Sequence, residues 1–110
     1  MQLRWSNESF TPGTVAQWRD GDLWYTARTA HDGDSHPKDY DCYSKKDITA
    51  FNRGDWSYVG VIVKAERPAN DDAMCEWIEV GSASLWGIES YSSAAYITSV
   101  ALDLAQEAIA

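Results

Sequence analysis

The residues most capable of chemistry lie together in one polar segment, H-D-G-D-S-H-P-K-D-Y-D-C, from His31 to Cys42. Two histidines, four aspartates and one cysteine fall within these twelve residues. Imidazole and thiolate groups bind zinc, and carboxylates suit calcium or magnesium. The spacing matches neither a zinc knuckle nor an EF-hand loop. A solvated loop without metal is therefore the favoured interpretation, and a metal site is the alternative.

Catalytic motifs are missing from the sequence. It contains no G-x-S-x-G, no H-E-x-x-H and no phosphate-binding glycine loop. Cys42 and His36 could serve as a nucleophile and its base, but nothing in the sequence places them together. We predict a protein that is not an enzyme and that uses no cofactor and no metal.

The net charge of the chain limits the classes of partner that it could bind. Nine Lys and Arg against seventeen Asp and Glu give a net charge of −8. A direct nucleic-acid or membrane partner would need a basic surface, so both are disfavoured, whereas a basic protein partner is allowed. The other explanation of the acidity is solubility alone.

Localisation is predicted from what the sequence lacks. No signal peptide and no apolar run near the ~18 residues of a membrane span are present, which predicts a cytoplasmic protein. Cys42 and Cys75 are then expected to be free thiols, with a single disulfide bond between them as the alternative.

The strongest strand signal runs from Gly54 to Lys64. Val59, Val61 and Val63 share one face, and apolar residues on the other face predict a central strand covered on both sides. A second long strand is expected over Cys75–Glu89, kinked or bulged at a glycine and paired antiparallel with the first. Further strands are predicted over Leu23–Ala30 and, weakly, over Met1–Phe10. Two of the glycines within these strands have predicted roles. Gly60 marks a place where a backbone or ligand could approach closely, and Gly81 is the expected site of the kink or bulge.

Helices are expected in three places. The C-terminal segment Ala94–Ala110 carries one apolar stripe at helical spacing and is preceded by candidate N-cap serines. Short helices are predicted over Val15–Arg19 and Ser44–Asn52, each ended by a glycine. The segments Val15–Tyr25 and Ile48–Tyr58 also align without gaps, which suggests a duplicated helix–strand unit. The candidate N-cap residues of the C-terminal helix are Ser92 and Ser93. Its expected apolar stripe consists of Ile97, Val100, Ala101, Leu104 and Ala108.

These elements predict one domain over residues 1–110 with an α+β fold. Its three- to five-stranded, mainly antiparallel sheet packs against the C-terminal helix, and short helices lie at the strand entrances. Trp86 is interpreted as a core tryptophan, with a ligand contact beside Gly87 as the alternative. Glu89 is expected to lie at the N-terminus of the final helix.

A resemblance adds a context. The segments D-W-S-Y-V-G-V-I-V (Asp55–Val63) and S-L-W-G-I-E-S (Ser84–Ser90) resemble a group of small proteins from phages and other mobile elements. The similarity covers about Asp47–Ala110, and the S-L-W-G-I-E-S string is its most specific part. It implies a mobile-element context and no particular activity. Small acidic proteins in that context are similar in size and charge to known inhibitors of CRISPR–Cas and restriction enzymes.

Three functions therefore compete. The first is inhibition of a host defence complex, in which acidic loops mimic nucleic acid and occupy a basic groove of a host protein or nucleoprotein complex. The second is a non-catalytic phage accessory protein, in one version a homodimer. The third is a binder of a small signalling nucleotide, which needs cationic groups in one pocket. The predicted partner-binding residues are Asp20, Asp22, Asp32, Asp34, Asp39 and Asp41, with Trp24 and Trp56 as aromatic anchors; the candidate cations for a nucleotide are Arg4, Arg19, Arg28 and Arg53.

Overall fold

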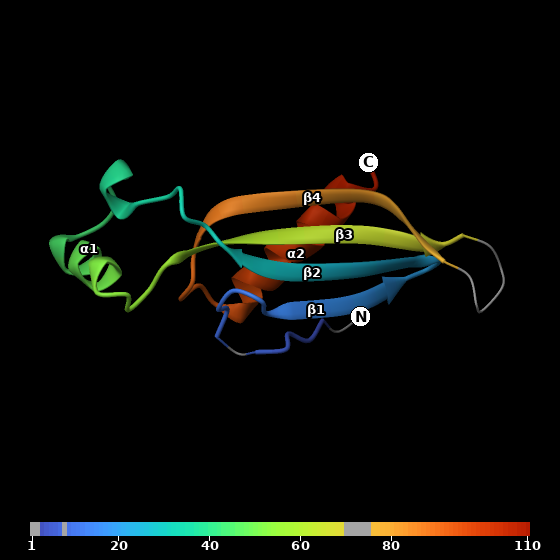
Figure 1. Cartoon of the computed structure of the whole chain (residues 1–110), viewed down its shortest axis with the longest axis horizontal. Coiled ribbons are helices and arrows are strands. Elements are labelled where there is room, and N and C mark those ends of the chain that lie inside the picture. The colour runs from blue at the N-terminus through green and yellow to red at the C-terminus, as the bar shows by residue number, and fades with distance from the viewer. Residues whose placement is uncertain (1–2, 8, 70–75) are drawn as a thin grey trace.

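A four-stranded antiparallel sheet with one long helix behind it forms the body of the protein (Figure 1). The structure is a computed structural model that describes residues 3–7, 9–69 and 76–110. Strands β1 (Val15–Asp20), β2 (Leu23–His31), β3 (Tyr58–Pro68) and β4 (Trp77–Glu89) lie side by side in chain order. The predicted α+β fold is confirmed.

β1 and β2 form a tight hairpin where the sequence predicts a short helix. Asp20 pairs with Leu23, and Gly21 takes a φ of 62° in the two-residue turn. Ala16 and Trp18 are buried while their neighbours are exposed, a period of two that defines a strand. The helix prediction over residues 15–19 is therefore wrong. The alignment with residues 48–58 does not reflect a structural duplication, because that segment forms a helix and a loop.

β3 and β4 are the longest strands, and their predicted antiparallel pairing is confirmed. Val59, Val61 and Val63 are fully buried against the helix. The register shifts between Ala65 and Glu66, so the bulge expected at Gly81 is also confirmed. A side chain on Gly81 would overlap the carbonyl oxygen of Ala108, which explains why glycine stands there.

α2 (Ala94–Ala108) packs against β3 and β4 and covers one face of the sheet. The Ser93 hydroxyl accepts a hydrogen bond from the Tyr96 amide at 3.1 Å and begins the helix. The whole predicted apolar stripe is buried, together with Ala105. Within the described residues, no helix is both long and apolar enough to cross a membrane.

The segment of residues 32–57, here called the lobe, extends beyond one end of the sheet (Figure 1). It contains the 3-10 turn η1 (Pro37–Asp39) and the predicted helix α1 (Lys45–Asn52). Ser44 and Asp47 form a reciprocal capping box, with two hydrogen bonds of 3.2 Å. The lobe lengthens the molecule to 56 × 24 × 20 Å.

The residues before β1 form no strand in the part that the structure describes, so the weak strand prediction over residues 1–10 fails there. They instead cover one end of the core. The Trp5 indole donates a hydrogen bond to Thr98 Oγ1 of α2 at 3.0 Å, and Phe10 is buried beside Trp5. Residues 1, 2 and 8 lie outside the described part.

Candidate functional site

One face of the sheet has no described element packed on it. α2 lies behind the other face, so the expectation that β3 is covered on both sides is wrong (Figure 1). Directly paired residues of an antiparallel sheet point to the same side. The register therefore collects one set of side chains on this open face. They are Val15, Gln17, Arg19, Trp24, Thr26, Arg28, Ile62, Lys64, Glu66, Trp77, Glu79, Ser82, Ser84 and Trp86.

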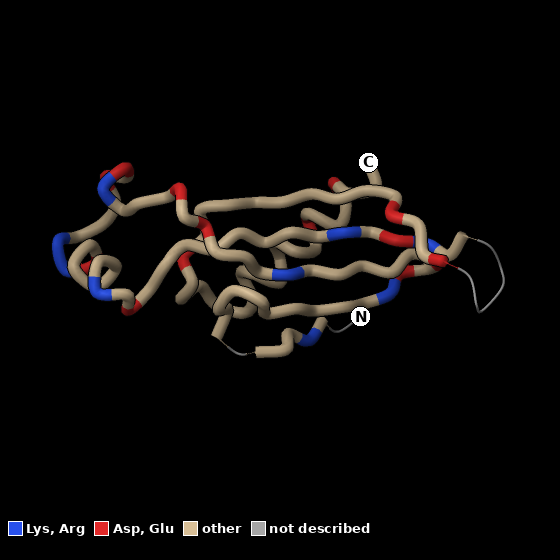
Figure 2. Tube along the Cα trace, in the orientation of Figure 1, with Lys and Arg blue, Asp and Glu red and all other residues tan. Residues whose placement is uncertain are grey.

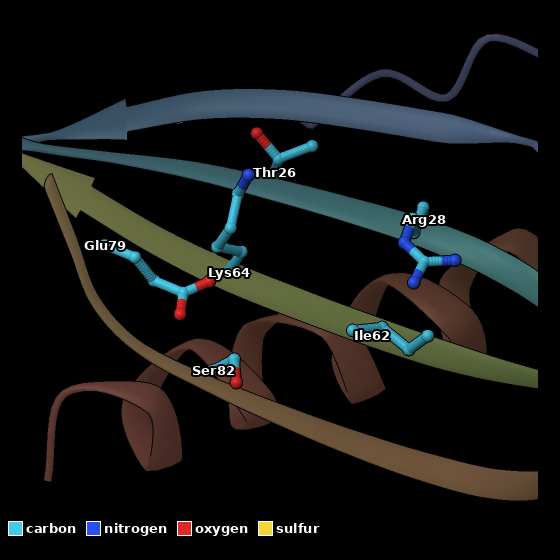
Figure 3. Close-up of a pocket in the computed structure, with 6 residues that line it drawn as sticks. All are labelled: Thr26, Arg28, Ile62, Lys64, Glu79 and Ser82. Carbon is cyan, nitrogen blue, oxygen red and sulfur yellow. The ribbon is translucent and has the colours of Figure 1, made fainter. Parts of the chain in front are cut away.

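A shallow hollow of about 280 Å³ lies near the middle of the open face (Figure 3). Three adjacent strands contribute to it, because Thr26 pairs with Lys64 and Lys64 pairs with Ser82. The hollow mixes two hydroxyls, one aliphatic side chain and three charged groups, so it could hold a polar ligand with a small apolar part. Its lining residues are Thr26, Arg28, Ile62, Lys64, Glu79 and Ser82.

The charge of the hollow differs in sign from that of the chain. Arg28 and Lys64 outweigh Glu79, whereas the whole protein carries −8. Lys64 Nζ lies 3.6 Å from Glu66 Oε1, a partly exposed ion pair. The Arg28 guanidinium makes no hydrogen bond or ion pair with any described residue. One cation of the hollow is therefore available to an external anion.

Exposed tryptophans flank the hollow at both ends of the open face. The Trp86 ring lies over Gly60, where no side chain could fit, so the close neighbour of this glycine is a side chain and not the predicted backbone or ligand. At the other end Trp24 and Trp77 meet edge to face, with ring centroids 6.2 Å apart. Glu66, the partner of Trp24, is six positions after Gly60 on β3. At ~3.3 Å per residue, the two ends of the open face are about 20 Å apart.

The interpretation of Trp86 as a core residue is therefore wrong. Trp86 is 47% exposed, and Trp77 is 49% exposed. The neighbouring Gly87 has a φ of 76° and donates its amide hydrogen to Asp32 at 2.8 Å. The bulge that turns Trp86 outwards is thus held from the lobe side by a carboxylate.

Asp32 has a structural role. Its carboxylate also accepts hydrogen bonds from the Ser35 hydroxyl at 2.9 Å and from the Asp34 amide at 3.0 Å. Burial alone would raise the pKa of the Asp32 carboxyl, but the hydrogen bonds from Ser35, Asp34 and Gly87 together lower it. Asp32 is only 7% exposed, so its carboxylate offers little surface to the partner that the sequence predicts for it.

An aromatic cluster joins the lobe to the sheet. The Tyr43 hydroxyl donates a hydrogen bond to Glu89 Oε1 at 2.6 Å, and burial with this bond raises the pKa of Tyr43. Glu89 is thereby occupied by the lobe, and the cap of α2 is Ser93. Trp56 is only 8% exposed and donates a hydrogen bond to the Asp47 carbonyl, so it is no exposed anchor. The cluster consists of Tyr40, Tyr43, Phe51, Trp56, Tyr58 and Tyr91.

The remaining predicted acids do not form one surface. Asp20 and Asp22 lie at the β1–β2 turn, and the other acids follow the opposite end of β2, about 30 Å away at ~3.3 Å per residue. Figure 2 shows acidic residues at both ends of the molecule. In the lobe the exposed Asp34, Asp39 and Asp41 are interspersed with Lys38, Lys45 and Lys46, so the charge there is mixed. Of the predicted anchors only Trp24, 38% exposed, is accessible.

The polar segment from His31 to Cys42 gathers no metal ligands. Among the described residues, no group of three or more His, Cys, Asp or Glu side chains is placed to hold an ion. His36 instead accepts a hydrogen bond from the Lys38 amide through Nδ1 at 3.1 Å and caps η1. A disulfide between Cys42 and Cys75 falls outside the described residues, because Cys75 is not among them.

Sequence reasoning missed most of the open-face site, although one signal was available. In β2, Trp24, Thr26 and Arg28 alternate with the buried Tyr25 and Ala27, which marks one face as polar. Lys64 and Trp77 were not identified as site residues at all. Arg28 was considered only as one of several scattered cations.

Comparison of the chain with protein-family models, curated proteins and solved structures finds no match. The geometry of the open face is therefore the guide to function.

Proposed function

We propose that this protein is a non-catalytic binding protein whose open sheet face recognises a small anionic ligand with a planar ring, such as a nucleotide. One observation carries the proposal: Arg28 and Lys64, 36 positions apart in the sequence, line the same hollow between exposed tryptophans. This is the arrangement that the nucleotide-binding hypothesis requires. The mobile-element context implied by the sequence resemblance favours a signalling nucleotide.

The anionic group would lie against Arg28. A guanidinium presents its N–H donors in a planar fork that matches phosphate and carboxylate oxygens, and such bonds are about twice as strong as neutral ones. Lys64 adds a second positive charge, and its weak ion pair with Glu66 is easily exchanged for a ligand contact. The hydroxyls of Thr26 and Ser82 provide donors for the remaining oxygens.

The planar ring would stack on Trp86. This tryptophan is held in place by the Gly60 surface beneath it, and its indole N–H bonds the Ser84 hydroxyl at 3.2 Å. A ring fixed in this way loses little conformational freedom on binding, and aromatic stacking contributes about 1–3 kcal/mol per base in single-stranded nucleic-acid complexes. Stacking and charge together select a ligand that carries both features.

Titration of the protein with a panel of mononucleotides and cyclic dinucleotides tests the proposal, with tryptophan fluorescence and calorimetry as readouts. Arg28→Gln removes a charged hydrogen bond worth about 1.5–3 kcal/mol, so affinity should fall about tenfold to hundredfold. Lys64→Gln should weaken binding by less, because Glu66 already shares its charge.

Arg53→Gln is the matched control. Arg53 forms an exposed ion pair with Asp55 in the lobe, away from the sheet face, and its loss should leave affinity unchanged. Inorganic phosphate separates the two parts of the site, since it lacks the ring and should bind more weakly than a nucleotide. If no member of the panel binds, or if the Arg28 variant binds as the wild type does, the proposal is wrong.

Inhibition of a host defence complex stays a prediction from the sequence. The nucleic-acid-mimic version has little geometric support, because the six aspartates are divided between two ends of the molecule and Asp32 is buried. The open face offers a different route to the same outcome, because a protein that sequesters a signalling nucleotide would also interrupt a defence pathway.

A further inference from the structure

The outer edge of β4 is a long strand edge without a described partner. β4 spans thirteen residues from Trp77 to Glu89, and β3 is its only partner in the described part of the chain. Among the described residues, two hydrogen bonds outside the ladder with β3 reach the backbone of β4, and both lie near its end: the Gly87 amide donates to Asp32, and the Glu89 carbonyl accepts from the Ser92 amide. The stretch from Trp77 to Trp86 therefore presents a row of free donors and acceptors, which is a template for pairing with another strand.

The opposite edge of the sheet is protected. β1 has only six residues, and the N-terminal segment covers its beginning. Ser6 donates its amide hydrogen to the Val15 carbonyl at 2.8 Å, and the Val15 amide donates to the Ser6 hydroxyl at 2.9 Å. Arg19 and Asp20 place charges at its other end. Short length, coverage and charge are the usual ways in which edge strands avoid association.

β4 lacks these protections. Glu79 and Glu89 are its only charged residues, and the stretch Val80–Ile88 between them carries none. Large apolar side chains are exposed on both faces of the strand: Trp77 and Trp86 on the open face, and Ile78 and Leu85 on the helix side. A lone soluble domain rarely leaves such an edge free of charge and proline.

We propose that β4 pairs antiparallel with β4 of a second copy of this chain, forming a two-fold symmetric dimer with one continuous eight-stranded sheet. The two register shifts of β4 bracket Gly81–Leu85, so the regular part of the edge is short and uncharged. Pairing centred on Ala83 places Leu85 opposite Gly81 of the second copy, and Ser82 opposite Ser84. Large and small residues then face each other, and no like charges are opposed.

A second copy fits this edge better than an unrelated chain. An antiparallel strand is its own complement about a two-fold axis, so the same residues satisfy both partners. The glutamates at the rims stay in water, where their repulsion is screened. The axis lies perpendicular to the sheet, so the two open faces, each with its hollow, lie on the same side of the dimer. The dimer forms through β4 alone and needs no ligand in the hollow.

Sedimentation equilibrium and light scattering on the full chain test the proposal, as does hydrogen exchange of the β4 amides. The wild type should show a concentration-dependent dimer. Those amides of residues 82–85 that point away from β3 should be protected only in the dimer. Leu85→Lys adds a charge to the edge on the helix side, and Ser84→Lys adds one on the open side. Each should weaken dimerisation by about tenfold or more, because charged side chains on an edge strand, lysine especially, oppose its pairing with another strand.

Leu102→Lys is the matched control. Leu102 is 39% exposed on α2 and Leu85 is 43% exposed on β4, so the two variants introduce the same change at similar exposure. The Leu102 variant should dimerise as the wild type does. Circular dichroism confirms that each variant is folded. A wild type that stays monomeric at high concentration, or a dimer that survives both edge variants, would overturn the proposal. Loss of the dimer only in the Leu102 variant would assign the contact to α2.

Discussion

The covered and open faces of the sheet come from alternate residues of the same four strands, yet their chemistry differs. The centre of the covered face consists of aromatic and aliphatic side chains that are almost fully buried under α2 and the N-terminal segment. The open face carries three cations, two glutamates, several hydroxyls and exposed tryptophans. The contrast indicates that stability is concentrated on the covered face. The open face is then free to use polar and aromatic groups for recognition.

Isoleucine truncation on the two faces should show the largest difference. Ile97 is fully buried between α2 and the sheet, and Ile97→Ala should lower the free energy of unfolding by about 2–5 kcal/mol. Ile62 lies on the open face and is only partly buried, so Ile62→Ala should cost less than about 1 kcal/mol. Chemical denaturation measures both. Equal losses would mean that the open face is covered in solution.

Two glycines of the sheet allow a second comparison. Gly81→Ala on the covered side places a methyl group against the Ala108 carbonyl, so the end of α2 must move. The free energy of unfolding should fall by about 1–3 kcal/mol. In Gly60→Ala on the open side, the nearest atoms to the new methyl group belong to the Trp86 ring, so this exposed side chain must shift and not the backbone. The substitution should change tryptophan fluorescence with a smaller loss of stability. Thermal unfolding and emission spectra of both variants check this, and the reverse order of stabilities would contradict it.

Asp32 is a polar residue that is nevertheless buried, and its hydrogen bonds support the open face. Asp32→Asn should lower the free energy of unfolding by about 1–2 kcal/mol. Asp34→Asn, which changes an exposed carboxylate, should leave it almost unchanged. The folded pKa of Asp32 lies below its usual value of 3.8. The advantage of wild type over Asp32→Asn should thus be complete above that pH and should be lost as the pH falls through the lowered pKa. Denaturation at several acidic pH values measures this, and a difference independent of pH would show that Asp32 acts by packing alone.

The parts of the fold with dense local signals could be predicted from the sequence. α2 combines a serine cap with an uninterrupted apolar stripe, and β3 combines β-branched residues with strict alternation. β1 could not be predicted in the same way. It has only six residues, and Val15 and Trp18 fit a helical spacing as well as Ala16 and Trp18 fit a strand. The Asp20-Gly21-Asp22 turn is compatible with either a helix end or a hairpin.

The candidate site depends on register, which local patterns do not encode. Arg28 and Lys64 become neighbours only because Thr26 pairs with Lys64 across β2 and β3. Conversely, the aspartates at positions 20–41 are close in sequence and far apart in space, because an extended strand separates them. The apolar Ile62 concealed the open face in β3, although the polar residues of β2 indicated it.

The lobe begins and ends at one place on the sheet. His31 pairs with Val59, and the Asp32 amide donates to the Tyr58 carbonyl at 3.0 Å, so β2 and β3 form one hairpin with a loop of 26 residues. Loop-closure entropy grows only with the logarithm of length, by about 0.6 kcal/mol per doubling. The entropic cost of closing such a loop exceeds that of a four-residue turn by about 2 kcal/mol. Related chains could therefore lengthen, shorten or exchange this loop while keeping the same sheet, helix and open face.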